Sequence, residues 1–208
     1  MMDARHKVTF LIGIFAFGLL SHAALADPSE EMARAEYFYN RQQIVDAVII
    51  FKKLAEENHL PAQARLGEIL DYTETDEDAV GWFIMAAAQG DANAAYGLAR
   101  MYLSGEGIKK DVDQAAFWFK YAAGKDNLNA IKVLEDAYRK GPTSGLNLPL
   151  DLNQAQIWEA KKLPLEAAQK KLEDEEIAAF KKKAEEERAA RRKADEEFAK
   201  MNAQGQKK

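Results

Sequence analysis

The sequence predicts an all-α protein: a right-handed solenoid (an alpha-alpha superhelix) of stacked helix pairs, followed by a charged C-terminal helix. Three alanines that open apolar segments are each followed, 15 residues later, by the alanine of the next apolar segment. The return intervals grow from 17 to 21 to 25 residues. A fixed interval is typical of a tight packed turn, and a growing one of a tolerant loop. The alanines that set these intervals are Ala47, Ala62, Ala79, Ala94, Ala115, Ala130 and Ala155.

The N-terminus has the pattern of a secretory signal peptide over residues 1–26. Arg5 and Lys7 precede an apolar run from Val8 to Leu20, and small residues end the segment at Ala26. A membrane span needs about 20 apolar residues, so this run favours cleavage over a retained anchor, which is the alternative. We therefore expect a chain exported to the periplasm or secreted, and beginning at Asp27.

The composition argues against most catalytic and metal-binding chemistry. The chain has no cysteine and a net charge of −5, so neither disulfides nor nucleic-acid binding is expected. Two of its three histidines lie in the predicted signal peptide, and the third, His59, precedes Pro61 at an expected helix end, where a capping or exposed role is favoured. We predict no catalytic residues, no cofactor and no metal.

Each predicted pair follows a helical spacing of apolar residues, because positions i, i+3, i+4 and i+7 form one stripe on a helix. Small and large residues alternate along these stripes, which lets neighbouring helices approach closely. In the second helices the stripe residues are Ala47, Ile50, Phe51, Leu54; Ala79, Trp82, Phe83, Ala86; and Ala115, Trp118, Phe119, Ala122. In the first helices they are Ala62, Leu66, Ile69, Leu70; Ala94, Leu98, Met101, Tyr102; and Ala130, Leu134, Ala137, Tyr138.

The predicted turns contain helix stop and start signals. Gly90 and Gly124 are expected to close helices in the left-handed conformation, and Asp91 and Asn127 to cap the helices that follow. The longer loops run through residues 104–107 and 141–145, and the helices after them are expected to restart at Asp111 and Asp151.

One set of residues within the segment 86–123 follows a known repeat pattern: Leu98, Tyr102, Gly105, Gly107, Ile108, Asp111, Ala115, Trp118, Phe119, Ala122 and Ala123. In these residues the segment resembles the Sel1-like repeat family, a group of helical repeats related to the tetratricopeptide repeat. The similarity is specific over residues 60–126, and the pair around residues 33–54 resembles a tetratricopeptide unit more closely. The resemblance implies a protein-binding adaptor of the kind found in bacterial envelope, motility or secretion assemblies.

The fourth copy departs from this pattern, which suggests a polar terminal cap. Glu159 stands in place of the phenylalanine and Lys162 in place of an alanine. Because Pro164 predicts a break, we expect the solenoid to cover residues 27–163 and a separate charged tail to cover residues 164–208. The tail's apolar residues are too sparse for a sustained heptad seam. A solitary helix is favoured, with a partner-dependent coiled coil or disorder as alternatives.

Other motifs have structural explanations that outweigh functional ones. The tryptophans Trp82, Trp118 and Trp158 fall in the apolar stripe, which favours core packing over a ligand platform. The acidic residues 74–78 lack the spacing of a calcium loop, and the glycines of residues 105–107 lack the ending of a phosphate loop.

The remaining candidate for function is the surface. In a stacked solenoid the first helices usually line the concave side, where partners bind. The positions between the core stripes there are Arg65, Glu68, Gly97, Arg100, Val133 and Asp136. We predict a non-enzymatic envelope scaffold that binds a protein or extended peptide on this face, with the oligomeric state left open. A structural spacer that uses the C-terminal helix is the main alternative, and a cell-wall-associated enzyme the least favoured one.

Overall fold

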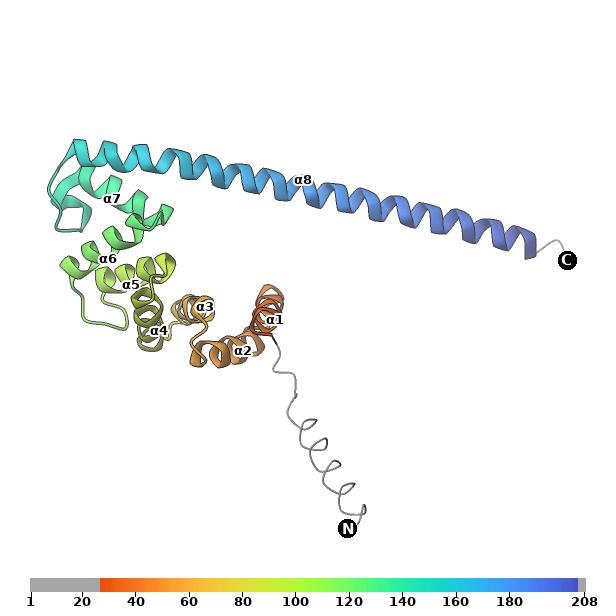
Figure 1. The fold of residues 1–208 in the computed structure, drawn as a ribbon, viewed down its shortest axis with the longest axis horizontal. Coiled ribbons are helices and arrows are strands. Elements are labelled where there is room, and N and C mark those ends of the chain that lie inside the picture. The colour runs from red at the N-terminus through yellow and green to blue at the C-terminus, as the bar shows by residue number, and fades with distance from the viewer. Residues whose placement is uncertain (1–26, 206–208) are drawn as a thin grey trace, which may run out of the picture. The chain divides into compact units, whose positions relative to one another are not determined.

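A computed structural model describes residues 27–205 of the chain, with side chains as far as Lys193. The predicted signal peptide over residues 1–26 lies outside the described residues. Over residues 27–205 the regular structure is helical and contains no strand (Figure 1). The predicted all-α class and the stacking of consecutive helix pairs are therefore confirmed.

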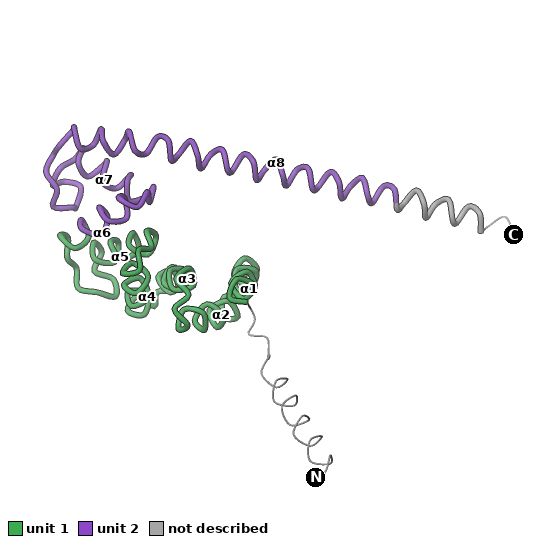
Figure 2. The backbone as a smooth tube through the Cα atoms, in the orientation of Figure 1, with its two compact units in different colours: residues 1–115 green, residues 116–208 purple. Residues whose placement is uncertain are grey.

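The chain forms two compact units, which meet in sequence between Ala115 and Ala116 (Figure 2). Unit 1 contains α1 (Pro28–Asn40), α2 (Ile44–Glu56), α3 (Leu60–Tyr72), α4 (Asp76–Ala88) and α5 (Ala92–Ser104). Helix α6 (Val112–Gly124) begins in unit 1 and continues in unit 2. Unit 2 also contains α7 (Leu128–Lys140), a 3-10 turn (Gly141–Ser144) and α8 (Leu152–Gly205).

Helices α1 to α7 share one length of 13 residues. Three-residue linkers join α1 through α5 in turn and join α6 to α7, and the middle residue of each linker has a positive φ. Gly90 takes this place as predicted, with φ 98°. The prediction for Gly124 was wrong: it ends α6, and Asp126 is the left-handed residue, with φ 65°. An aspartate tolerates this conformation because its short polar side chain can hydrogen-bond locally.

The predicted caps are confirmed. The side chains of Asp91 and Asn127 accept hydrogen bonds from the backbone N–H groups of Ala94 and Ala130, at 2.7 and 2.9 Å. His59 caps α3 in the same way, because its Nδ1 accepts from the N–H of Ala62 at 3.3 Å. These side chains satisfy donors that the first turn of a helix leaves unpaired.

The core of unit 1 depends on a phenylalanine that fills a socket made by two glycines. Phe83 of α4 is 1% exposed. A Cβ atom added to Gly67 of α3 would lie 2.7 Å from its ring, and one added to Gly97 of α5 would lie 2.6 Å from it. Since Cβ atoms are excluded at such distances, only glycine at these two positions lets the ring enter in this arrangement. Phe83 thereby joins three successive helices.

The three tryptophans are partly buried, whereas Phe83 and Phe119 are fully buried. Trp82 packs against the apolar cluster formed by α1, α2 and α3. Trp118 lies edge-on to Phe117 and Tyr121, with ring centroids 5.2 and 5.6 Å apart. Trp82 and Trp118 are therefore less deeply buried than the phenylalanines that follow them in sequence, Phe83 and Phe119.

The glycine-rich loop after α5 serves packing within unit 1. Gly107 has φ 64°, and a Cβ atom there would collide with the backbone of Asp76 at the start of α4. Asp76, Glu77 and Asp78 form the acidic first turn of α4, where carboxylates interact favourably with the helix dipole. Both motifs thus have the structural roles that the sequence favoured.

The predicted break at Pro164 was wrong, because α8 is one helix of 54 residues that runs through it. A proline inside a helix leaves the carbonyl four residues earlier without its helical partner. Both Pro164 and that residue, Ala160, are exposed, so water can satisfy the carbonyl. Within the described part of the chain, no helix is both long and apolar enough to cross a membrane.

Candidate interaction surface

In unit 1, ion pairs connect the first helices α1, α3 and α5. Arg65 of α3 binds Glu36 of α1 through two nitrogens, at 2.9 and 3.1 Å, and binds Glu68 of its own helix at 2.9 Å. Its guanidinium carbon also lies 4.4 Å from the ring centroid of Tyr39. Bidentate contact to a carboxylate and stacking on an aromatic ring are the interactions that arginine makes best.

These contacts stabilise the charged form of Arg65. Partial burial lowers the pKa of the guanidinium, but the hydrogen bonds that it donates to the carboxylates of Glu68 and Glu36, together with their charges, outweigh burial and leave the pKa above its ordinary value. Arg65 is therefore held in place by residues of its own chain.

Arg100 extends the same arrangement to α5. Its Nη1 lies 2.9 Å from Oδ2 of Asp71 on α3, and its side chain is 48% exposed. Tyr72, the neighbour of Asp71, is 80% exposed. We call the set of ion-paired side chains on α1, α3 and α5, together with this tyrosine, the first-helix face. It comprises Glu36, Arg65, Glu68, Asp71, Tyr72 and Arg100.

The structure separates the six residues that the sequence selected. Arg65, Glu68 and Arg100 lie on the first-helix face. Gly97 is buried against the ring of Phe83, so its selection as surface was wrong: it is a packing position that lets a neighbouring helix approach. Partner binding by the other five residues stays a prediction.

The two selected residues of unit 2 lie on α7. Val133 is partly buried, and Asp136 is exposed and bonded to Lys140 one turn later, at 2.8 Å. An exposed pair at i, i+4 contributes only about 0.3–0.5 kcal/mol, so Asp136 stays available to other cations.

Sequence reasoning missed Glu36, Asp71 and Tyr72. Glu36 and Arg65 are separated by 29 residues, and so are Asp71 and Arg100. That repeated separation of opposite charges was a usable signal. This separation of 29 residues is close to the number of residues from one first helix to the next. It therefore places an acid on one first helix opposite an arginine on the next.

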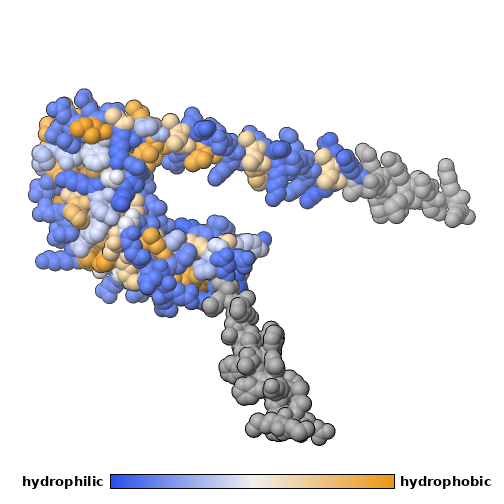
Figure 3. Space-filling model, in the orientation of Figure 1, coloured by the Kyte–Doolittle hydropathy of each residue, from blue (hydrophilic) through white to orange (hydrophobic). Residues whose placement is uncertain are grey.

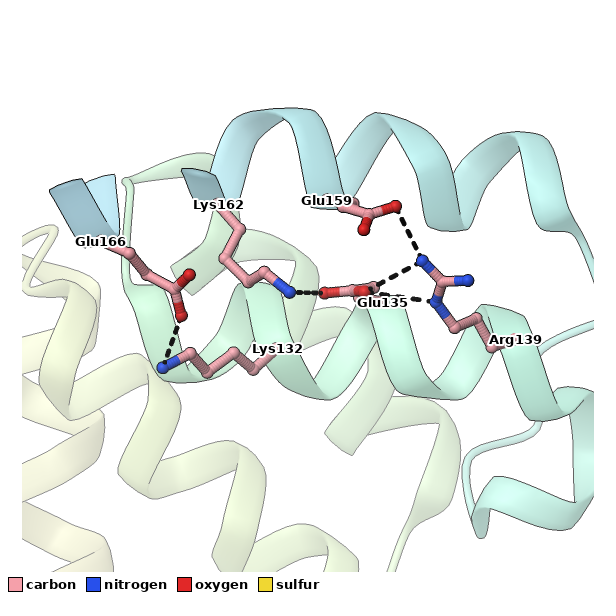
Figure 4. A network of polar contacts seen from close by, with 6 residues as sticks. All are labelled: Lys132, Glu135, Arg139, Glu159, Lys162 and Glu166. Atoms are coloured by element: carbon pink, nitrogen blue, oxygen red, sulfur yellow. Dashed lines mark hydrogen bonds and ion pairs between the residues drawn. The ribbon is translucent and has the colours of Figure 1, made fainter. Parts of the chain in front are cut away.

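Unit 2 has a different charged cluster, where α8 packs on α7 (Figure 4). Glu135 of α7 accepts hydrogen bonds from Lys162 at 2.5 Å and Arg139 at 3.2 Å, and Arg139 also binds Glu159 at 2.8 Å. Lys132 and Glu166 pair at 3.0 Å on the same two helices. We call these six residues the ionic seam.

The seam perturbs both of its central groups. Burial raises the pKa of Glu135, but Lys162 and Arg139 together outweigh burial and leave it below its usual value. The hydrogen bond to Glu135 raises the pKa of Lys162. The polar residues Glu159 and Lys162 are thus not simply an uncovered outer face, because they bind α7.

Among the side chains that the structure describes, as far as Lys193, no group of three or more His, Cys, Asp or Glu residues is arranged to hold a metal ion. What the first-helix face offers is directional charge and an exposed aromatic ring on consecutive helices. These features suit binding to another macromolecule.

The Sel1 repeat pattern matches residues 60–91 and 92–127, which correspond to α3 with α4 and to α5 with α6. Residues 60–127 of this chain therefore form two Sel1 repeats. Sel1 repeat proteins generally act as protein-interaction scaffolds, and their fold is typically non-enzymatic. The socket of Phe83 lies within the first matched repeat and receives Gly97 from the second.

Two crystal structures share the architecture. A Sel1 repeat protein from Oxalobacter formigenes is 30% identical, with a TM-score of 0.57 over 66% of this chain and 58% of that one. The protein c5321, a protective antigen present in uropathogenic Escherichia coli strains that displays an SLR fold, is 28% identical. Its TM-score is 0.57 over 68% of this chain and 34% of that one.

A similar sequence is the uncharacterized protein NMB1327 of Neisseria meningitidis serogroup B, which is 32% identical over 95 residues. The match covers 46% of this chain and 20% of that protein. The chain therefore spans less than two thirds of the length of each of these three relatives.

Proposed function

We propose that this chain is an exported, non-enzymatic scaffold of the bacterial envelope that binds a protein or an extended peptide along the first-helix face. The Sel1 repeats support the scaffold role. The leader-like pattern of residues 1–26 supports export. The interaction surface rests on its own observation, the exposed side chains of α3 and α5.

That observation is the exposure of Tyr72 on α3 and of Arg100 on α5, two successive first helices. Tyr72 is 80% exposed, and Arg100 is 48% exposed while it contacts the adjacent Asp71. Tyrosine and arginine are enriched among the residues that dominate binding energy at protein interfaces. Asp71 orients Arg100, which reduces the side-chain entropy that a partner must overcome.

The test is capture of partners from envelope extracts by the chain that begins at Asp27. Tyr72→Ala and Arg100→Glu are each expected to reduce the captured set at least about tenfold, the loss typical of one important interface residue. Lys52→Glu is the matched control, because Lys52 is an exposed cation on the second helix α2. If all three variants capture the same proteins as the unmodified chain, the first-helix face is not the binding surface.

Export has a separate test, because it depends on a different part of the chain. Expression of the full chain is expected to yield a periplasmic or secreted product whose first residue is Asp27. A product that keeps Met1 and stays in the membrane fraction would support the retained anchor instead.

A structural spacer is the second candidate, and the length of α8 favours it. Its 54 residues would extend for about 80 Å at 1.5 Å per residue. Ion pairs between α8 and α7 extend as far as Glu166, and the residues from Ala167 to Lys193 are exposed almost throughout. Such a helix could hold the repeats away from an attachment point.

Truncation after Gln169 discriminates between the two roles, since it removes the exposed helix and keeps the ionic seam. Unchanged capture together with lost cellular function would favour the spacer. Unchanged capture together with full cellular function would favour the scaffold. A purified chain that hydrolyses cell-wall material would contradict the non-enzymatic assignment.

A further inference from the structure

The exposed part of α8 carries large apolar side chains. Figure 3 shows this stretch as mainly hydrophilic, with small apolar patches along it. Ile177 is 53% exposed and Phe180 is 74% exposed. Isolated apolar residues on a surface are ordinary, so their arrangement has to decide whether they matter.

Their arrangement follows a heptad register over residues 177–201. Because α8 is uninterrupted, residues seven apart lie near one line along the helix. One core line contains Ile177, Ala184, Arg191 and Phe198. The second core line, three residues further on, contains Phe180, Glu187, Ala194 and Met201.

We propose that residues 177–201 of two copies of this chain form an antiparallel coiled coil centred on Ala189. In an antiparallel pair each residue of one core line faces a residue of the other line. Here the two lines are mirror images about Ala189. The facing pairs are Ile177 with Met201, Phe180 with Phe198, Ala184 with Ala194, and Glu187 with Arg191.

This register matches every layer by type. The two-fold symmetry repeats each pair, which gives eight layers: six join apolar residues of similar size, and two join Glu187 of one copy to Arg191 of the other. In a parallel pair Glu187 would face its own equivalent, and so would Arg191. Like charges in a seam that excludes water are destabilising, so the charged layers select the antiparallel orientation.

Residues that flank the core lines agree with the same orientation. Antiparallel pairing brings Lys181 near Asp195 of the second copy, and Lys183 near Glu197. Arg188 lies near its own equivalent at the two-fold axis, where a long exposed side chain can extend its charge into water.

The proposed coiled coil is about 37 Å long and includes charged layers, so we expect the two copies to associate reversibly. It is independent of the first-helix face and of the scaffold proposal. The tail as a whole is too sparse in apolar residues for a sustained heptad seam, and a coiled coil was only an alternative there. The short stretch 177–201 of the continuous helix nevertheless keeps one register, and the mirror symmetry of that register points to a second copy as the partner.

Sedimentation equilibrium of the chain that begins at Asp27 tests the association. A concentration-dependent dimer is expected, and Phe180→Glu is expected to lower the association constant at least about tenfold, because each dimer loses two buried rings. Leu172→Glu is the matched control, since Leu172 is 61% exposed but lies off both core lines. Far-UV circular dichroism confirms that both variants stay helical. A chain that is monomeric at about 100 µM, a hundredfold above a micromolar Kd, overturns the proposal.

Cysteine cross-linking tests the orientation, and the natural chain has no cysteine to interfere. A mixture of Ala184→Cys and Ala194→Cys chains is expected to form a disulfide between copies, and neither variant alone is expected to do so, because its sulfurs would lie too far apart. Glu187→Arg should weaken the dimer, and adding Arg191→Glu should restore it. Self-linking of Ala184→Cys, or no restoration by the second charge change, overturns the antiparallel register.

Discussion

The helix pair α3 and α4 in unit 1 and the pair α7 and α8 in unit 2 use opposite chemistry at equivalent positions. In unit 1, Gly67 lies beneath the ring of Phe83. In unit 2, the equivalent positions hold Glu135 and Glu159, which are joined through Arg139. The comparison shows that one helix-pair geometry accepts either an apolar ring in a glycine socket or a network of charges.

The Phe83 socket and the ionic seam require different residues on the neighbouring helices. The ring of Phe83 needs an absence of side chains on two other helices, so it is tied to Gly67 and Gly97. Glu135 needs cations within reach, and Lys162 and Arg139 supply them. The apolar pair therefore depends on volume, and the charged pair depends on protonation state and salt.

Removal of the ring is expected to have the largest effect. Phe83→Ala should lower the free energy of unfolding by about 3–5 kcal/mol, since it leaves a cavity between three helices. Urea unfolding monitored by circular dichroism measures this change. Ile84→Ala, at the 44% exposed neighbour, is expected to cost far less. Equal losses for the two variants would show that the socket is not the centre of unit 1.

A side chain that fills the glycine socket is expected to cause the second-largest loss of unfolding free energy. Gly67→Ala should cost about 1–3 kcal/mol although alanine favours helices, because the ring is confined from the other side by Gly97 and cannot move away. Gly81→Ala in α4 is the matched control: a Cβ atom there meets nothing within 4 Å. That variant should stabilise by about 0.5–1 kcal/mol. The comparison of sockets fails if both substitutions stabilise the chain.

The ionic seam should respond to pH, whereas the glycine socket contains no titrating group. The pKa of Glu135 is lowered in the folded chain, so its contribution is present above the unfolded value of about 4.3 and is lost as pH falls through the folded value. The pKa of Lys162 is raised, so its contribution is present below about 10.4 and is lost as pH rises through the folded value.

Glu135→Gln is accordingly expected to cost about 1 kcal/mol at neutral pH, because it removes the negative charge that Lys162 and Arg139 share and keeps only a neutral acceptor. The difference between the variant and the unmodified chain should shrink as pH falls from about 4.3, the unfolded value, through the lower pKa of Glu135 in the folded chain. Unfolding at a series of pH values measures it. A constant difference down to acid pH would mean that packing of the side chain, and not its charge, stabilises the seam.

The smallest effect is expected at the edge of the seam. Lys132→Ala should cost no more than about 0.5 kcal/mol, since the pair with Glu166 is exposed on both sides and screened by water and salt. Unfolding at low and high salt checks this value. A loss as large as that of Glu135→Gln would show that the seam acts as one network.

The helices and their stacking could be predicted from local pattern. The spacing of apolar residues predicted which side of each helix is buried, and Asp91 and Asn127 predicted where α5 and α7 begin. These signals work because they depend on residues close in sequence. The left-handed backbone conformation of Asp126 was not predicted. Aspartate occurs both at the ends and at the starts of helices, and the sequence does not distinguish the two positions.

The contacts between helices were harder to predict. Gly97 lies outside the apolar stripe, which suggested surface, but a missing side chain off the stripe is also what admits a ring from the next helix. The sequence did contain a signal for the ionic seam. One position of the first helices holds Gly67, Ala99 and Glu135 in successive repeats, and one position of the second helices holds Phe83, Phe119 and Glu159. Both change to glutamate together, which is typical of a rebuilt contact.

The first-helix face was located in part, because helix phase selected Arg65, Glu68 and Arg100 correctly as non-core positions of unit 1. Phase alone does not say which acid lies opposite each arginine, so Glu36 and Asp71 were not found. The continuity of α8 through Pro164 was also missed, since a proline usually ends a helix unless the freed carbonyl faces water.

Hydrogen exchange of the unmodified chain and of Glu135→Gln at neutral pH, read peptide by peptide, tests most directly whether the two helix pairs are held by different forces. If the ionic seam holds α7 and α8 together, the variant should exchange faster in α7 and in residues 152–166 of α8, and exchange in α3 and α4 should be unchanged. Unchanged exchange in α7 and α8, or an equal increase in α3 and α4, would contradict it.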